Sequence, residues 1–164
     1  TVGTNHLGHF HLNRLLIPHL DSNARIVVTA SGVHDPETPG GSRGKAATLG
    51  NLDGMIRDAI DFEMIDGTAY NSDKAYKDSK LCNVLFTREL QRRLSEEAST
   101  KDISVNCFSP GLIMSTGFFR NQNRLKAMVF HIIAVYLFRY AETPEWGGAC
   151  LAHVASQNTK GQYY

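Results

Sequence analysis

Two short runs of apolar, β-branched residues with a long helical pattern between them restrict the fold of this chain most. The runs are residues 25–31 and 103–108, and residues 73–95 carry apolar side chains at helical spacing. A strand, a helix and a second strand in this order predict a right-handed parallel crossover, because parallel strands need such a connection. We therefore expect an α/β fold with a doubly wound, Rossmann-like parallel sheet.

Helical spacing recurs toward both ends of the chain, over residues 4–20 and 145–155, and residues 161–164 resemble the start of a further strand. The 164 residues are 42% hydrophobic and 20% charged, a balance typical of a soluble globular domain. The formal net charge of +1 gives no electrostatic argument for a nucleic-acid partner. We therefore expect no nucleic acid to bind.

The cysteines and histidines do not form a recognisable metal pattern. The three cysteines lie far apart without a Cys-x-x-Cys pair, which argues against both a disulfide framework and a zinc site. His6, His9 and His11 cluster in the first helical pattern, but no Glu or Asp stands at helical spacing from them. We therefore expect no metal site.

Residues 32–72 are expected to form a long insert rather than regular structure. The stretch holds two prolines and seven glycines and shows little sustained periodicity. A loop of this length inside a compact domain is uncommon, and such loops are usually functional or disordered. Met55-Ile56 and Ala59-Ile60 indicate a short helix within it, and residues 62–65 indicate a brief extended piece.

A second irregular region, residues 112–143, contains a strongly apolar run over residues 127–138. The run is too short to span a bilayer, and His131 interrupts it. It fits either an ordinary core helix or a lid-like segment, residues 118–138, that covers an apolar ligand and contacts an anionic membrane surface. The membrane interpretation depends on flanking basic residues, which are Arg120, Arg124, Lys126 and Arg139. Both interpretations stay open at this point.

Tyr76 and Lys80 form a Tyr-x-x-x-Lys pair near the start of the helix predicted over residues 73–95. Positions four apart lie on the same face of a helix, so the Lys80 ammonium is expected near the Tyr76 phenol. A nearby positive charge favours the phenolate and lowers the tyrosine pKa. Such a phenol can donate a proton near neutral pH. Taken alone the pair is a weak signal, since a solvated helix face shows the same spacing.

Two upstream residues strengthen that signal. Ser31 ends the first predicted strand, and open α/β sheets place their ligand chemistry at the carboxyl ends of strands. Asn5 begins the stretch Asn-His-Leu-Gly-His-Phe of residues 5–10. Asn, then Ser, then Tyr-x-x-x-Lys is the order of the short-chain dehydrogenase/reductase family. The chain resembles the second half of a domain of that family.

More narrowly, the chain is similar to the light-dependent NADPH:protochlorophyllide oxidoreductases within that family. The resemblance covers nearly the whole chain, and its most specific parts are residues 50–54, 75–83 and 116–120. The long insert between Ser31 and Tyr76 also resembles this group, because most short-chain reductases place the two residues much closer together.

The resemblance implies roles for individual residues. Tyr76 would donate a proton, Lys80 would hold the nicotinamide ribose and lower the tyrosine pKa, and Asn5 would take part in the proton relay. Ser31 would occupy the place of the catalytic Ser or Thr. The nicotinamide end of the cofactor site would be lined by Pro110, Gly111 and Thr116.

The reaction implied by the resemblance is the reduction of the C17=C18 double bond of protochlorophyllide to chlorophyllide, a step of chlorophyll biosynthesis. NADPH would supply the hydride, light absorbed by the pigment would drive the first step, and the protein would position the two partners. The implied location is the chloroplast, with peripheral contact to thylakoid or inner plastid membranes as a further expectation. Homo-oligomer formation stays open.

Two departures from the family pattern matter. The chain has no strand, Gly-rich turn and helix for a dinucleotide phosphate, so residues 1–164 are expected to be the C-terminal portion of one domain whose cofactor-binding half is missing. Leu112 stands where the family commonly has a cysteine of the pigment site. Two other functions therefore stay open: a general short-chain reductase for an apolar carbonyl or alcohol such as a retinoid or steroid, and a catalytically divergent pigment-binding paralogue.

Overall fold

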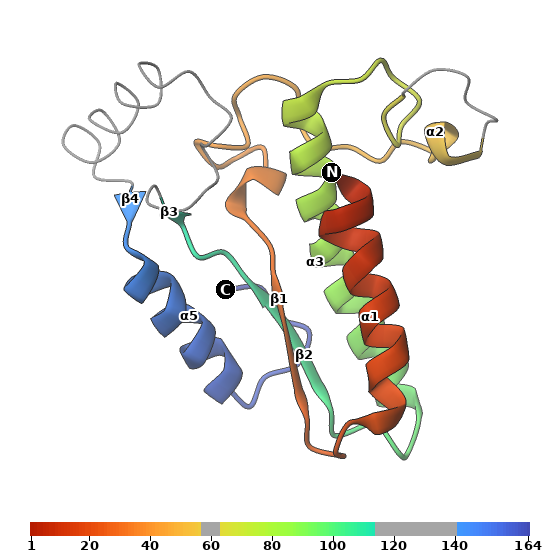
Figure 1. Ribbon diagram of the computed structural model, residues 1–164, viewed down its shortest axis with the longest axis vertical. Coiled ribbons are helices and arrows are strands. Elements are labelled where there is room, and N and C mark those ends of the chain that lie inside the picture. The colour runs from red at the N-terminus through yellow and green to blue at the C-terminus, as the bar shows by residue number, and fades with distance from the viewer. Residues whose placement is uncertain (57–62, 114–140) are drawn as a thin grey trace.

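Two parallel strands form the centre of the protein in the computed structural model, which describes residues 1–56, 63–113 and 141–164 (Figure 1). Strand β1 (Arg25–Thr29) pairs with β2 (Ser104–Phe108) in parallel, and Thr29 lies opposite Phe108. Beyond β2, Tyr163 forms a parallel bridge with Cys107, so the end of the chain extends the sheet. The parallel pair predicted from the sequence is confirmed.

Helices cover both faces of this sheet. Helix α3 (Ser72–Glu96) connects the two strands and lies on one face beside α1 (Gly8–Leu16), whereas α5 (Pro144–Ser156) lies on the other (Figure 1). A π-helical turn, Gly3–Leu7, precedes α1, and a 3-10 turn, Ile17–His19, follows it. The result is the three-layer α/β/α arrangement of a doubly wound fold.

Side-chain caps begin the two longer helices. The Asn71 side chain accepts a hydrogen bond from the Lys74 backbone amide at 2.8 Å, and Thr143 does the same for the Trp146 amide at 3.2 Å. Pro144 occupies the first turn of α5, where its missing amide hydrogen costs nothing. These caps fix where α3 begins, and therefore where Tyr76 lies relative to the sheet.

The hydrophobic core lies between the sheet and α3. All five residues of β2 are buried, and Val84 and Leu94 of α3 pack against the strands. Strand β1 is only partly buried and Thr29 is exposed, although a continuous apolar run of this kind predicts a fully buried parallel strand. The difference arises because β2 lies between two chain segments, whereas β1 has a strand neighbour on one side only among the described residues.

The buried face of α3 differs from the apolar face predicted from the sequence. Leu85 occupies an apolar position of that helical pattern but is 46% exposed. Polar side chains of the first turns are buried in its place, and these are Lys74, Lys77, Asp78 and Ser79. Their burial could not be predicted from the sequence pattern, because lysine and aspartate are almost never fully buried unless they are paired.

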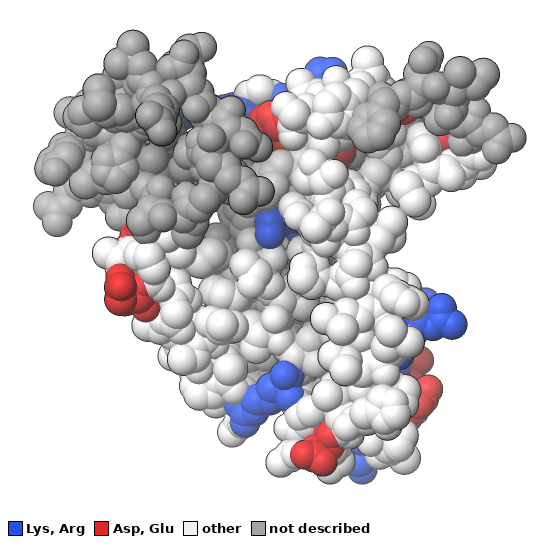
Figure 2. All heavy atoms as spheres, viewed as in Figure 1, with Lys and Arg blue, Asp and Glu red and all other residues white. Residues whose placement is uncertain are grey.

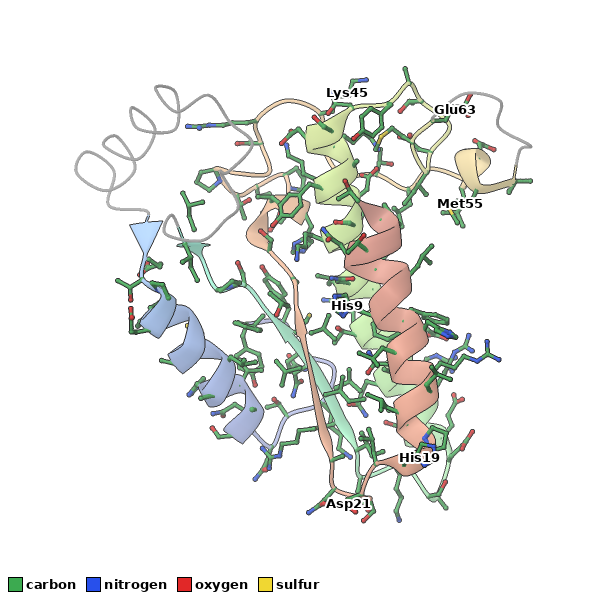
Figure 3. The ribbon with its side chains drawn as sticks, in the orientation of Figure 1. His9, His19, Asp21, Lys45, Met55 and Glu63 are labelled. Atoms are coloured by element: carbon green, nitrogen blue, oxygen red, sulfur yellow. The ribbon has the colours of Figure 1, made fainter. Side chains whose placement is uncertain are left out.

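The insert, residues 32–72, packs over the N-terminal end of α3, where Lys45 is labelled in Figure 3. Apart from residues 57–62, which are outside the described part, it contains a 3-10 turn (Gly32–His34) and α2 (Asp53–Ile56). Glu63 and Ala69 form an isolated antiparallel bridge. Helix α2 confirms the short helix expected at Met55 and Ile56, whereas Ala59 and Ile60 lie outside the described residues. Of the expected extended piece, only Glu63 forms a bridge, and Ile65 already lies in a turn.

After β2 the chain forms β3 (Leu112–Ile113), which pairs in parallel with β4 (Ala141–Glu142). The lid-like segment proposed over residues 118–138 lies outside the described residues. Elsewhere, in residues 1–56, 63–113 and 141–164, no helix combines the length and apolar character needed to cross a bilayer.

Candidate functional site

Ser31 and Tyr76, which are 45 positions apart in the sequence, lie together at the carboxyl end of β1. Ser31 follows the strand in an extended conformation and precedes the 3-10 turn Gly32–His34. Tyr76 lies in the second turn of α3, half-buried, and its phenol shares a side-chain hydrogen bond with Ser31. The structure therefore brings together two residues that the sequence placed in one catalytic set.

The electrostatic environment of Tyr76 differs from the sequence-based expectation. Burial raises the pKa of the Tyr76 phenol above its ordinary value of 10.0, and the hydrogen bond with Ser31 acts in the opposite direction. The expectation of a lowered tyrosine pKa is therefore wrong for this structure. The physical reason is that loss of water around the phenol penalises the phenolate more than its neighbours stabilise it.

Lys80 lies beside Tyr76, as the spacing predicted. Its Nζ atom lies 5.6 Å from the centroid of the tyrosine ring, within the range of a cation–π contact. The same ammonium donates a hydrogen bond to the Thr29 carbonyl at 3.1 Å, which holds it at the end of β1. Burial lowers the pKa of Lys80.

Asn5 reaches the same region from the π-helical turn Gly3–Leu7. Its Nδ2 atom donates to Ser79 Oγ at 3.1 Å, and Ser79 Oγ donates to the Tyr76 carbonyl at 2.6 Å. Asn5 and Lys80 also line one cavity of about 370 Å³ along β1. Irregular π turns occur frequently at functional sites, because they aim a side chain differently from a regular helix.

Pro110 and Gly111 follow β2 at the same end of the sheet as Ser31. The Gly32 backbone amide donates to Ser109 Oγ at 3.2 Å, which ties the two strand ends together. Gly111 has a φ of +78°, and a Cβ atom there would lie 2.9 Å from Glu142 Cγ, so only glycine fits without displacement. Thr116, the third residue expected at the nicotinamide end, lies outside the described residues.

Comparison with known proteins gives a relationship over nearly the whole chain, although no protein-family model matches it. The chain is 34% identical over 163 residues to the chloroplastic protochlorophyllide reductase of Cucumis sativus, covering 96% of this chain and 40% of that protein. It is 36% identical over 163 residues to that of Marchantia paleacea, covering 95% and 35%. The chain is a homologue of the protochlorophyllide reductases. It spans well under half the length of these relatives.

A solved structure supports the fold assignment independently. RhlG of Pseudomonas aeruginosa, in an active-site complex with NADP, matches 99% of this chain and 53% of its own chain with a TM-score of 0.59 and 18% identity. At that identity the match shows the fold alone. Together with the parallel pair and its flanking helices, it identifies a Rossmann-like α/β fold.

Two residues that stabilise the candidate site, Ser79 and His34, were not identified from the sequence. Ser79, fully buried, links Asn5 to the backbone of α3. His34 Nδ1 lies 2.7 Å from the Ser31 carbonyl oxygen, and its ring packs edge-on against Tyr163 at 5.1 Å between centroids. Ser79 could have been found from the sequence, because it lies inside the Tyr-x-x-x-Lys motif. The contact of His34 with Tyr163 could not, because no sequence pattern links these two residues.

Proposed function

We propose that the protein containing this chain is an NADPH-dependent oxidoreductase that reduces the C17=C18 double bond of protochlorophyllide in the light, inside the chloroplast. The observation that carries the proposal is the convergence of Ser31, Tyr76 and Lys80 at the carboxyl end of β1 in a homologue of the protochlorophyllide reductases. Apolar substrates of this kind need a proton donor placed beside the reacting carbon, which this arrangement supplies.

The proposed roles follow from these contacts. Tyr76 donates the proton, since its raised pKa keeps the phenol protonated at neutral pH. Ser31 orients that phenol through their shared hydrogen bond, and Lys80 places a positive charge beside the ring. Asn5 connects this group to the cavity along β1 through Ser79.

The residues present fit the nicotinamide end of NADPH. Lys80 and Asn5 offer an ammonium and an amide to one cavity, and the Pro110–Gly111 turn lies at the same sheet end. Bound NADPH would supply the hydride for the reduction. We propose that Lys80 and Asn5 face the ribose, with Pro110, Gly111 and Thr116 at the nicotinamide.

We further propose that the other half of the cofactor site is formed by additional chain packed along the open side of β1. Leu12 is 49% exposed and lines the cavity beside β1 together with Val27. An exposed apolar side chain beside an unpaired strand edge is typical of a surface that another element covers. Figure 2 shows Lys, Arg, Asp and Glu scattered with broad uncharged areas between them.

The pigment and membrane contacts belong to the same proposal. Leu112 lies in β3, directly after Gly111, and takes the position at which the family commonly has a cysteine. We propose that Leu112 contacts the pigment without supplying a thiol. The segment 118–138 would cover the pigment and touch an anionic membrane surface, because its apolar run, residues 127–138, has basic side chains on both flanks.

The direct test uses full-length protein with NADPH and protochlorophyllide, assayed in matched dark and illuminated samples. We expect chlorophyllide to form only under illumination. Steady reduction of a retinoid or steroid in the dark, without pigment turnover, would assign a general short-chain reductase. Tight pigment binding without turnover in either condition would assign a divergent pigment-binding protein.

A further inference from the structure

The three residues between Tyr76 and Lys80 are buried more deeply than the two residues that enclose them. Lys77, Asp78 and Ser79 are 1%, 0% and 0% exposed, whereas Tyr76 and Lys80 are half-buried. A buried charge is costly unless it is paired and hydrogen-bonded. The contacts of the buried lysines therefore identify the segment that packs against this part of α3.

Lys77 is surrounded by one loop of the insert. Its ammonium donates hydrogen bonds to the backbone carbonyls of Gly41 at 3.3 Å, of Arg43, and of Lys45 at 3.1 Å. Asp73, one turn earlier on α3, balances the charge at 3.2 Å. Three carbonyls can converge on one ammonium only while residues 41–45 stay curved around it.

Lys74 binds two further residues of the insert, Asp66 and Thr48. Its ammonium pairs with Asp78 at 2.7 Å and with Asp66 at 3.0 Å, and it donates to the Thr48 carbonyl at 2.9 Å. The other carboxylate oxygen of Asp78 accepts the Thr48 amide at 3.0 Å. Lys74 is 3% exposed, so water screens this ion network little.

We propose that Lys74 and Lys77 form a clamp that holds the insert against α3 and thereby positions Ser31 beside Tyr76. The insert begins at the residue after Ser31, and the two lysines stand on either side of Tyr76 in the sequence. Movement of the insert away from α3 would therefore separate the two hydrogen-bonded side chains. Both lysines are positioning residues, and the catalytic part of this inference rests on the proposed function.

The clamp itself is tested by proteolysis of the full-length Lys77→Met variant, which keeps the buried stem and removes the ammonium. Trypsin cleaves after Arg43 and Lys45, but only once the loop leaves its curved conformation. We expect cleavage at these two sites to become about 10-fold faster or more, because cleavage follows the population of the open loop. Arg88→Met, an exposed charge loss on the same helix, is the matched control. Equal rates in both variants would overturn the clamp.

A measurement on the unaltered protein keeps the inference testable if Lys77→Met fails to fold. The Thr48 amide donates to buried Asp78, and the Ser42 amide donates to the Thr38 carbonyl at 2.9 Å. We expect both amides to exchange with deuterium far more slowly than the amide of Ala98, which lies in an exposed turn. Exchange as fast as that of Ala98 would contradict a clamped insert.

The positioning role is tested by separating turnover from cofactor binding. In Lys77→Met we expect kcat/KM for the pigment to fall about 10-fold or more, since small displacements of reacting groups have large effects on rate. The NADPH dissociation constant should be unchanged, because Lys80 and Asn5 bond to Thr29 and Ser79 rather than to the insert. Unchanged turnover with an opened loop, or a parallel loss of NADPH affinity, would refute positioning. Inactive unaltered protein would refute the proposed function alone, since proteolysis still decides the clamp.

Discussion

Helices α1 and α3 lie side by side on one face of the sheet but differ in the kinds of side chain that they bury (Figure 1). The apolar residues of α1 are largely exposed, as Phe10 at 46% and Leu15 at 56% illustrate, and α1 has no buried residue. By contrast, α3 buries Lys77 and Asp78 almost completely. Apolar side chains therefore face outward on one helix while charged ones are enclosed on its neighbour.

This difference shows that each helix is shaped by what packs against it. The charged residues of α3 are buried because the insert supplies carbonyl and carboxylate oxygens to their ammonium groups. The apolar residues of α1 have no comparable cover among the described residues. We therefore interpret α1 as a packing surface for further chain and α3 as the element that carries the chemistry.

The largest expected effect is a loss of stability when an exposed apolar residue of α1 is shortened. In the full-length protein, Leu12→Ala on α1 should lower the free energy of unfolding by about 2–5 kcal/mol, because we propose that additional chain buries Leu12. Leu85→Ala on α3 is the matched control, with 46% exposure against 49% for Leu12. Chemical denaturation of both variants measures the difference. Equal, small effects would show that α1 has no such cover.

The next effect concerns Lys80, the half-buried residue that ends the Tyr-x-x-x-Lys motif. Lys80→Ala should raise the NADPH dissociation constant about 10-fold or more, since a hydrogen bond to a charged group contributes about 1.5–3 kcal/mol. Fluorescence titration measures this, with the exposed Lys101→Ala as control. An unchanged dissociation constant would remove Lys80 from the cofactor site.

The smallest expected effect is the pH dependence of the stability contributed by an exposed ion pair on the solvent-facing side of α3. Hydrogen bonds from Arg92 and Arg93 lower the pKa of Glu89 from 4.5 to about 2. The stability contributed by this carboxylate should be present above about pH 4.5 and lost as pH falls through about 2. The difference in Tm between the unaltered protein and Glu89→Gln should shrink over that range. It should also be small in high salt, because all three groups are exposed.

The sequence predicted the parallel strands, the long helix and the order of Asn5, Ser31, Tyr76 and Lys80, since periodicity and motif spacing are local signals. It did not predict the buried lysines, because their partners are backbone carbonyls of an irregular insert and carry no sequence signature. The tyrosine pKa was misjudged for a related reason. Spacing revealed the charge of Lys80, whereas the burial of the Tyr76 phenol depends on how the tertiary structure packs.

Replacement of the phenol oxygen tests the central claim most directly. In the full-length protein with saturating NADPH and protochlorophyllide, Tyr76→Phe should lower the rate of chlorophyllide formation after a light flash by about 10²-fold or more, since only the proton donor is lost. Tyr164→Phe, across the sheet in the cavity beside α5, should match the unaltered protein. A near-normal rate in Tyr76→Phe, with both variants fully folded, would contradict the assignment of Tyr76 as the proton donor.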